Sequence, residues 1–228
     1  MGLPAPGRCF FERDKPVETY PSLLLIGPTG AGKTPLGHLL DERGLHGRHC
    51  HHFDFGRQLR LAVRGEGAAD VLSETDVEFL RCVLEEGALL EDEHFPIAER
   101  ILTHFIENQG VQPSDYTVLN GLPRHVGQAR DLRRLVDIRF VIRLKCSARV
   151  VRERIRRNTG GDRTHREDDT REDIRGRLEL YRQRTLPLIE HLEDGGTPVL
   201  ALEVGPETTS EQMWRELEGE NEGPAPKG

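Results

Sequence analysis

The chain has 228 residues, of which 31 % are charged and 36 % hydrophobic, a composition typical of a soluble globular protein with a substantial core. The formal net charge of −7 argues against a general nucleic-acid binder, and the longest apolar run, residues 23–26, is too short to span a bilayer. The N-terminus lacks the layout of a signal peptide, and the four cysteines form no C-x-x-C pair, as is usual for reduced cytosolic thiols.

The chain begins with a segment that we interpret as an arm. Residues 1–21 are rich in proline and glycine at first, with a candidate edge strand around residues 9–11. The first core strand is predicted at Leu23–Ile26, because nearly continuous apolar runs are typical of parallel strands covered on both faces.

The first motif follows this strand and precedes a helix predicted to about Glu42. It comprises Gly27, Pro28, Thr29, Gly30, Ala31, Gly32, Lys33 and Thr34. This is the P-loop pattern G-x-x-x-x-G-K-[ST], in the strand–loop–helix context that it requires. Backbone N–H groups and the helix N-terminus favour a phosphate chain there, with Lys33 on the β- and γ-phosphates and Thr34 on Mg²⁺. We therefore expect a triphosphate site with Mg²⁺ as cofactor.

A second strand with its exit loop is predicted over residues 49–56, and it contains His49, Cys50, His51 and His52. Histidine and cysteine are common metal ligands, so a metal site is one hypothesis for this stretch. Along a strand, however, His49 and His51 face one way and Cys50 and His52 the other, so no face collects three ligands. A polar strand near a sheet edge is the favoured interpretation.

Helices and strands alternate through the rest of the chain. Helices are predicted at 77–84, opened by an acidic first turn at 73–76, and at 97–106, 148–157, 170–192 and 210–217; strands are predicted at 116–119, 139–144 and 198–202. Residues 218–228 have few apolar side chains, which predicts a disordered acidic tail. The alternation predicts an α/β fold in which helices wrap both faces of a parallel sheet.

Several separate motifs make the chain resemble the adenylate kinase (nucleoside monophosphate kinase) family, from Ser22 to Leu217. The stretch Asn120–Arg124, with Gln128, is similar to D-G-F-P-R…Q, and Phe55–Arg60 is similar to T-G-D-x-L-R. Residues 87–90 resemble the segment whose backbone lines the acceptor base. Residues 166–169, with Arg177, resemble the lid border R-x-D-D…R, and residues 185–189 match T-x-P-L-I.

The resemblance implies a three-layer P-loop kinase fold with a parallel sheet, an inserted helical segment that binds the nucleoside monophosphate (NMP), and a short lid. The core would be 22–53, 111–157 and 170–217, the insert about 54–92, and the lid about 158–169. It implies catalytic roles for Lys33, Arg124, Arg166 and Arg177, and a place near the donor base for Arg154. The NMP-binding set that it implies is Phe55, Gly56, Arg60, Leu90, Gly121, Arg124 and Gln128.

The chain departs from the family pattern at several positions. The carboxylate that begins D-G-F-P-R, and that helps to hold the water shell of Mg²⁺, is Asn120 here. Asp54 is the nearest acid that could substitute, so Asp54 or Asn120 would meet the metal through water. Phe55 replaces a threonine near the acceptor base, Asn158 stands where an arginine is usual, and G-K-T-P replaces G-K-G-T.

Three functions are consistent with this sequence. The favoured one is transfer of the γ-phosphoryl group of Mg·ATP to a nucleoside monophosphate, with AMP as the default acceptor. The second is a P-loop kinase of a hydroxyl-bearing metabolite, with Asp54 as base, and the third is a nucleotide-binding protein with weak or lost transfer through Asn120. For the favoured function we expect ATP and NMP as partners, no nucleic acid or membrane, a monomer, and a cytoplasmic location.

Overall fold

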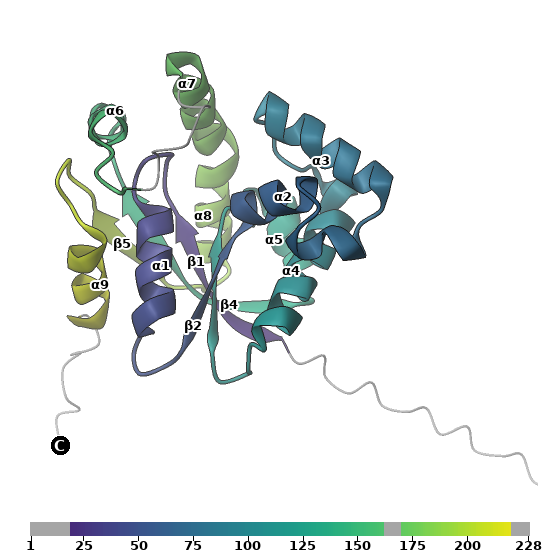
Figure 1. Cartoon of the computed structure of the whole chain (residues 1–228). Helices are drawn as coiled ribbons and strands as arrows, with labels where there is room; N and C mark the ends of the chain where they lie inside the picture. The colour runs from purple at the N-terminus through teal and green to yellow at the C-terminus, as the bar shows by residue number, and fades with distance from the viewer. Residues whose placement is uncertain (1–18, 162–169, 220–228) are drawn as a thin grey trace, which may run out of the picture.

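A computed structural model describes residues 19–161 and 170–219 (Figure 1). The candidate edge strand at residues 9–11, most of the predicted lid with Arg166, and the predicted tail from residue 220 onward lie outside these ranges. The last helix, α9 (Ser210–Gly219), includes two residues that the sequence assigned to the tail.

The described strands form one parallel sheet in the order β2-β3-β1-β4-β5 (Figure 1). Their bounds are β1 (Tyr20–Ile26), β2 (Cys50–Asp54), β3 (Tyr116–Asn120), β4 (Val136–Lys145) and β5 (Val199–Glu203). The parallel α/β fold is therefore confirmed, and β2 lies at a sheet edge as expected. The chain crosses from one side of β1 to the other, and ligands of such sheets bind where this reversal leaves a crevice at the carboxyl ends of the strands.

Alternate residues of β1 face two separate cores, as the period of a strand requires. Leu23 and Leu25 pack with residues of α1 (Lys33–Arg43) and α9, whereas Leu24 and Ile26 pack on the opposite face with residues of α4 (Phe95–Gln109) and α8 (Leu186–Asp194). Helices therefore cover both faces (Figure 1). Each fully buried leucine contributes about 2 kcal/mol, which fixes β1 and the loop that follows it.

Between β2 and β3 the chain forms a helical insert beside the sheet, followed by α4 (Figure 1). The insert comprises α2 (Phe55–Val63), the 3₁₀ turn η1 (Gly67–Val71), α3 (Glu74–Glu86) and the 3₁₀ turn η2 (Asp92–His94). The acidic first turn predicted for α3 is a capping box: Ser73 Oγ accepts from the Asp76 N–H at 3.1 Å, and Asp76 accepts from the Ser73 N–H at 2.9 Å.

The remaining helices are α5 (Val126–Leu132), α6 (Ala148–Arg157) and α7 (Arg171–Leu180). The single helix predicted over 170–192 is interrupted: α7 runs into a π-helical turn, η3 (Tyr181–Thr185), before α8. Pro187, near the start of α8, has no N–H to donate to the carbonyl of Gln183, so the regular hydrogen-bond ladder breaks there. Tyr181 and Thr185 of this turn line a cleft that also contains residues of the loop after β1.

Candidate active site

The P-loop connects the end of β1 to α1 in the conformation that its glycines permit. Gly30 and Gly32 have φ values of 75° and 103°, which side chains disfavour. Lys33 begins α1, and its Nζ donates to the carbonyls of Gly27 at 2.7 Å and Pro28 at 2.9 Å. The ammonium group is therefore held over the loop, beside the N-terminus of α1, where negative charge is favoured.

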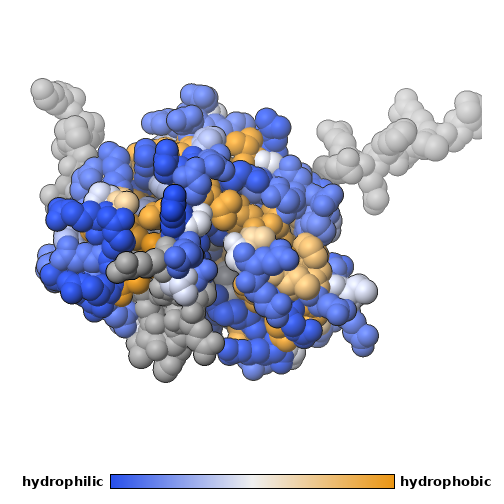
Figure 2. All heavy atoms as spheres, turned by 90° about the horizontal axis from the view of Figure 1, so that it is seen from above, coloured by the Kyte–Doolittle hydropathy of each residue, from blue (hydrophilic) through white to orange (hydrophobic). Residues whose placement is uncertain are grey.

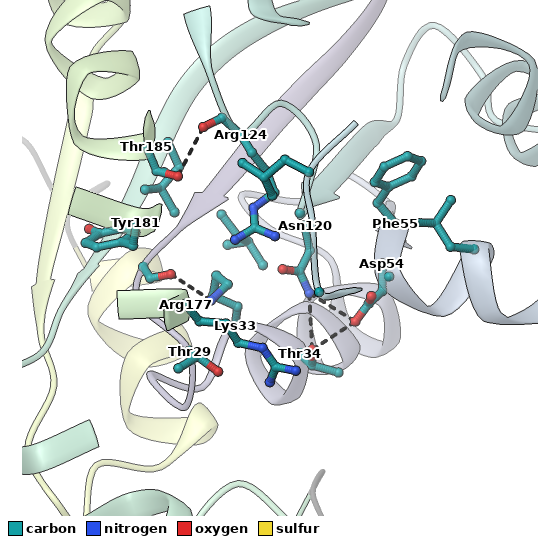
Figure 3. Close-up of a pocket in the computed structure, with 18 of the residues that line it drawn as sticks. Thr29, Lys33, Thr34, Asp54, Phe55, Asn120, Arg124, Arg177, Tyr181 and Thr185 are labelled. Carbon is teal, nitrogen blue, oxygen red and sulfur yellow. Dashed lines mark hydrogen bonds between the residues drawn. The ribbon is translucent and has the colours of Figure 1, made fainter. Parts of the chain in front are cut away.

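One cleft at the carboxyl ends of the strands contains the P-loop and most of the predicted acceptor site. On this face, apolar side chains lie at the centre and hydrophilic ones surround them (Figure 2). Among the described residues, four cations from separate elements line the cleft: Lys33, Arg60, Arg124 and Arg177. Three of them, Lys33, Arg124 and Arg177, point toward a shared space (Figure 3). Positive charge is thus concentrated where two phosphate chains could meet.

The surroundings of Arg124 disfavour its charged form. Burial, and secondarily the like charge of Arg177, lowers the pKa of Arg124 to about 10. Its backbone is fixed on both sides, because the N–H donates to Gln128 Oε1 at 2.8 Å and the carbonyl accepts from Thr185 Oγ1 at 3.1 Å. An anion between the two guanidinium groups would relieve their repulsion, so the arrangement favours a phosphate.

Thr34, Asp54 and Asn120 form a hydrogen-bonded cluster under the P-loop (Figure 3). Thr34 Oγ1 donates to Asp54 Oδ2 at 2.9 Å, and Asn120 Nδ2 lies 3.2 Å from each of these oxygens. β2 and β3 are parallel neighbours, with Asp54 opposite Asn120, so both residues reach the same edge. A hydroxyl and a carboxylate oxygen this close suit Mg²⁺, which prefers a few oxygen ligands together with water and phosphate.

Comparison with known proteins identifies relatives over most of the chain, although no protein-family model matches it. A protein named adenylate kinase from Synechococcus sp. (strain WH7803) is 32 % identical over 76 % of this chain and 85 % of its own length. The chain belongs to the adenylate kinase family. Adenylate kinases from Haloarcula marismortui and Natronomonas pharaonis are 26 % and 28 % identical, over 87 % and 88 % of this chain and 95 % and 96 % of their lengths.

The resemblance predicted from the motifs is therefore confirmed. This family member is a phosphotransferase and, more narrowly, a nucleoside monophosphate kinase. Within the described residues, no helix has the length and apolarity needed to cross a membrane. Within the same residues, no group of three histidine, cysteine, aspartate or glutamate side chains is placed to hold a metal ion, so the histidine-rich strand β2 carries no such cluster.

The predicted NMP-binding residues lie in the same cleft as the P-loop. The described lining of this cleft includes Phe55, Gly56, Arg60, Leu90, Gly121, Arg124 and Gln128. Phe55 is 6 % exposed and points away from the phosphate-binding groups, toward the apolar core (Figure 3). The aromatic ring in the place of threonine therefore enlarges the apolar packing of this kinase; its contact with a base remains a prediction.

Arg154 lies behind the P-loop. Its Nε donates to the Gly30 carbonyl at 3.1 Å, and its Nη1 donates to the carbonyls of Gly205 and Thr208, each at 2.8 Å. Arg154 is 3 % exposed and ties the P-loop to the segment between β5 and α9. Its predicted contact with the donor base stays a prediction. Asn158, which replaces the usual arginine, ends α6 with a left-handed φ of 50°, a conformation that asparagine tolerates well.

The motifs did not reveal how the loop after α3 is fastened. Three consecutive residues of this loop contact residues distant in sequence. The carbonyl of Leu90 accepts from Gln128 and His125. Glu91 pairs with Arg184, and Asp92 lies beside His125. His125 directly follows the predicted Arg124, but its partners could not be inferred from spacing along the chain. The only local signal was a histidine that the family motif does not require.

Changing Asn120 to aspartate should restore a second carboxylate beside Thr34 and Asp54. Without metal, the two carboxylates would repel each other at about the 3.2 Å that now separates Asn120 Nδ2 from Asp54 Oδ2, so the melting temperature should fall. With ATP present, affinity for Mn²⁺ or Mg²⁺ should rise about tenfold, because ligand charge tunes divalent-ion affinity. Titration calorimetry and thermal melts test both effects. Unchanged metal affinity would show that residue 120 does not face the metal.

His52 should make the stability of this kinase depend on pH. It is buried under Asn120, with Nε2 3.3 Å from Asn120 Nδ2, and burial is the main cause that lowers its pKa to about 4; His38 lowers it further, while Asp54 and Asp41 act in the opposite direction. The unfolded chain then binds more protons between pH 6.5 and about 4. The contribution of His52 to the free energy of unfolding is therefore fully present above about pH 6.5. About 3 kcal/mol of it is lost as the pH drops toward 4.

Urea unfolding at pH 7 and pH 4.5 measures this loss. His52→Gln, which can still accept from Asn120 and does not titrate, should lose less stability between the two pH values than the wild type. His104→Gln is the matched control, since His104 lies on α4, away from the cleft, 3.3 Å from Asp70. An equal loss in the wild type and His52→Gln would contradict the assignment.

Proposed function

We propose that this kinase transfers the γ-phosphoryl group of Mg·ATP to AMP. One observation carries the proposal: Lys33 of the P-loop and Arg60, Arg124 and Arg177 line a single cleft. The names of the relatives, adenylate kinases, support adenylate as the acceptor. The triphosphate would lie at the P-loop and the monophosphate between the insert and α5, with their phosphates end to end.

In the proposed reaction an oxygen of the acceptor's phosphate attacks the γ-phosphorus of ATP. The bond from that phosphorus to the β–γ bridging oxygen breaks and ADP leaves with the electron pair. The acceptor phosphate is ionised at neutral pH, so no general base is needed. Both Asp54 oxygens are already engaged, Oδ2 with Thr34 and Oδ1 with the Arg57 N–H at 2.9 Å, which disfavours Asp54 as a base.

The side chains supply positioning and charge neutralisation. Lys33 would hold the β- and γ-phosphates, Arg60 and Arg124 the acceptor phosphate, and Arg177 the transferred group, where negative charge spreads in the transition state. Arg166 is proposed for the same task, although it lies outside the described residues. Thr34, with Asp54 and Asn120 through water, would hold Mg²⁺. When bound, Mg²⁺ neutralises charge on the β- and γ-phosphates.

The test is ADP release from Mg·ATP in the presence of AMP, CMP, UMP, GMP or dAMP. We expect turnover with AMP above that with the other monophosphates. A higher rate with a monophosphate other than AMP would overturn the choice of AMP. If none of the monophosphates stimulates ADP release, the proposed reaction is wrong.

Two variants separate this function from a kinase of a hydroxyl-bearing metabolite. If the acceptor is a phosphate, Arg60→Ala should reduce turnover more than Asp54→Asn does. If the acceptor is a hydroxyl that needs a base, the ranking should be reversed.

A further inference from the structure

The carbonyl of Leu90 is the meeting point of two side chains in the acceptor half of the cleft. It accepts from Gln128 Nε2 at 2.8 Å and from His125 Nε2 at 3.1 Å. Because a carbonyl can only accept, His125 must carry a hydrogen on Nε2. The two donors occupy both lone pairs of this buried oxygen.

The two residues after Leu90 are fastened as well. Glu91 accepts from both terminal nitrogens of Arg184, at 3.1 and 2.7 Å, and Asp92 Oδ1 lies 3.4 Å from His125 Nδ1. Because a carboxylate oxygen only accepts, Nδ1 holds Asp92 when it too carries a hydrogen, which makes the ring an imidazolium. Gly127 permits the approach of Asp92, because a Cβ at that position would come within 2.0 Å of the Asp92 carboxylate. Both nitrogens of the buried His125 ring thus face the loop, and the contacts of Gln128 and Gly127 place this loop against α5. We call residues 87–92 the acceptor loop.

Gln128 has a second task that competes with holding this loop. Leu59, Val83, Leu84 and residues 87–90 line the same cleft and offer a base no polar side-chain group. Gln128, whose Nε2 lies 2.8 Å from the Leu90 carbonyl, supplies an amide that can hydrogen-bond a base. When its amide turns to a base, the Leu90 carbonyl loses one donor, and a buried acceptor without a donor is costly.

We propose that His125 is a positioning residue for the acceptor: by bridging Leu90 and Asp92, it holds the acceptor loop against α5 while Gln128 engages the base. The proposal rests on the proposed function, since it takes the acceptor to be a nucleoside monophosphate. It assigns His125 no contact with the reacting atoms. Its loss should therefore weaken acceptor binding and leave the ATP site and the chemical step intact.

The experiment measures AMP affinity by calorimetry without ATP, and KM for each substrate, in the wild type, three His125 variants and two further variants. His125→Leu should raise the Kd and KM for AMP about tenfold, with KM for ATP and kcat changed by less than about twofold. His125→Gln places an amide N–H near the Nε2 position and should restore most of the affinity. His125→Asn reaches only the side of the ring that faces Asp92, and should not.

His104→Leu is the matched control, because His104 pairs with Asp70 outside the cleft; it should leave both KM values unchanged. Asp92→Ala, a change at an exposed side chain, covers the case in which His125→Leu does not fold, and it should raise KM for AMP about threefold. If the wild type binds no monophosphate, the proposed function fails. If the wild type binds AMP and folded His125→Leu or folded Asp92→Ala binds it equally well, the proposed role of His125 is wrong. It is also wrong if His125→Gln fails to restore AMP affinity.

Discussion

Replacing Lys33 with alanine is expected to lower kcat/KM for phosphoryl transfer by about 10³-fold and to remove measurable ATP binding. Lys33 Nζ is held within 2.9 Å of the P-loop carbonyls of Gly27 and Pro28, where a triphosphate would compete for its hydrogens. In a partly desolvated cleft, the removal of one positive charge next to a phosphate costs far more interaction energy than the same removal on the surface. Calorimetry with Mg·ATP and a coupled ADP assay provide the measurement.

Lys145→Ala is the matched control for this prediction. Lys145 is an exposed lysine on β4 that pairs with Glu203 at 3.2 Å, and it does not line the cleft. Its replacement should leave ATP affinity and turnover within about twofold, since exposed ion pairs contribute little. Intact ATP affinity in Lys33→Ala would refute the assignment of the P-loop.

Replacing Arg124 with alanine should reduce kcat/KM for the monophosphate by about 10² to 10³-fold while KM for ATP stays constant. The variant should be as stable as the wild type or more so, because burial and Arg177 already disfavour the cation at this position, as its lowered pKa of about 10 indicates. Arg124→Lys should recover only part of the rate, since an ammonium group lacks the planar pair of donors. Steady-state kinetics and thermal melts report the two effects separately.

Arg130→Ala, on α5, tests whether the loss of any arginine near Arg124 in the sequence would give the same result. Arg130 is exposed, six residues after Arg124, and is expected to change neither activity nor stability. A marked loss of stability in Arg124→Ala, with activity falling only in proportion to the unfolded fraction, would show that Arg124 serves the fold and not the acceptor.

Local patterns predicted much of the fold. The P-loop, the capping box at Ser73 and the alternation of strands with helices each depend on neighbours within a few residues, so the sequence displays them directly. Boundaries were less accurate: β4 runs from Val136 to Lys145, wider than the predicted 139–144. Residues 136–138 pair with β1, and Lys145 pairs with Glu203 of β5, so neighbouring strands extend β4 at both ends.

The π-helical turn and the fastening of the acceptor loop were not predicted. Pro187 was visible, but its effect on η3 depends on how the helix is packed against the sheet. His125 and Arg184 act through residues 35 and 93 positions away, Leu90 and Glu91. No periodicity encodes such pairs, and only the folded chain brings them together.

The departure at Asn120 illustrates the opposite case. Its consequence could be anticipated, because parallel neighbours end at the same edge and Asp54 ends the other strand. The structure places Asp54 Oδ2 2.9 Å from Thr34 Oγ1 and so supplies a carboxylate from β2, next to the position where the family pattern has one on β3. Whether this acid meets the metal is what Asn120→Asp measures.

The proposed function requires a triphosphate and a monophosphate to lie end to end in one cleft lined by Lys33, Arg60, Arg124 and Arg177. Calorimetric titration with diadenosine pentaphosphate, which joins both nucleotides in a single molecule, tests it directly. We expect one ligand per chain, bound more tightly than ATP, that displaces ATP and AMP together. Two ligands per chain, or displacement of one nucleotide but not the other, would place the two phosphates in separate sites and refute a shared cleft.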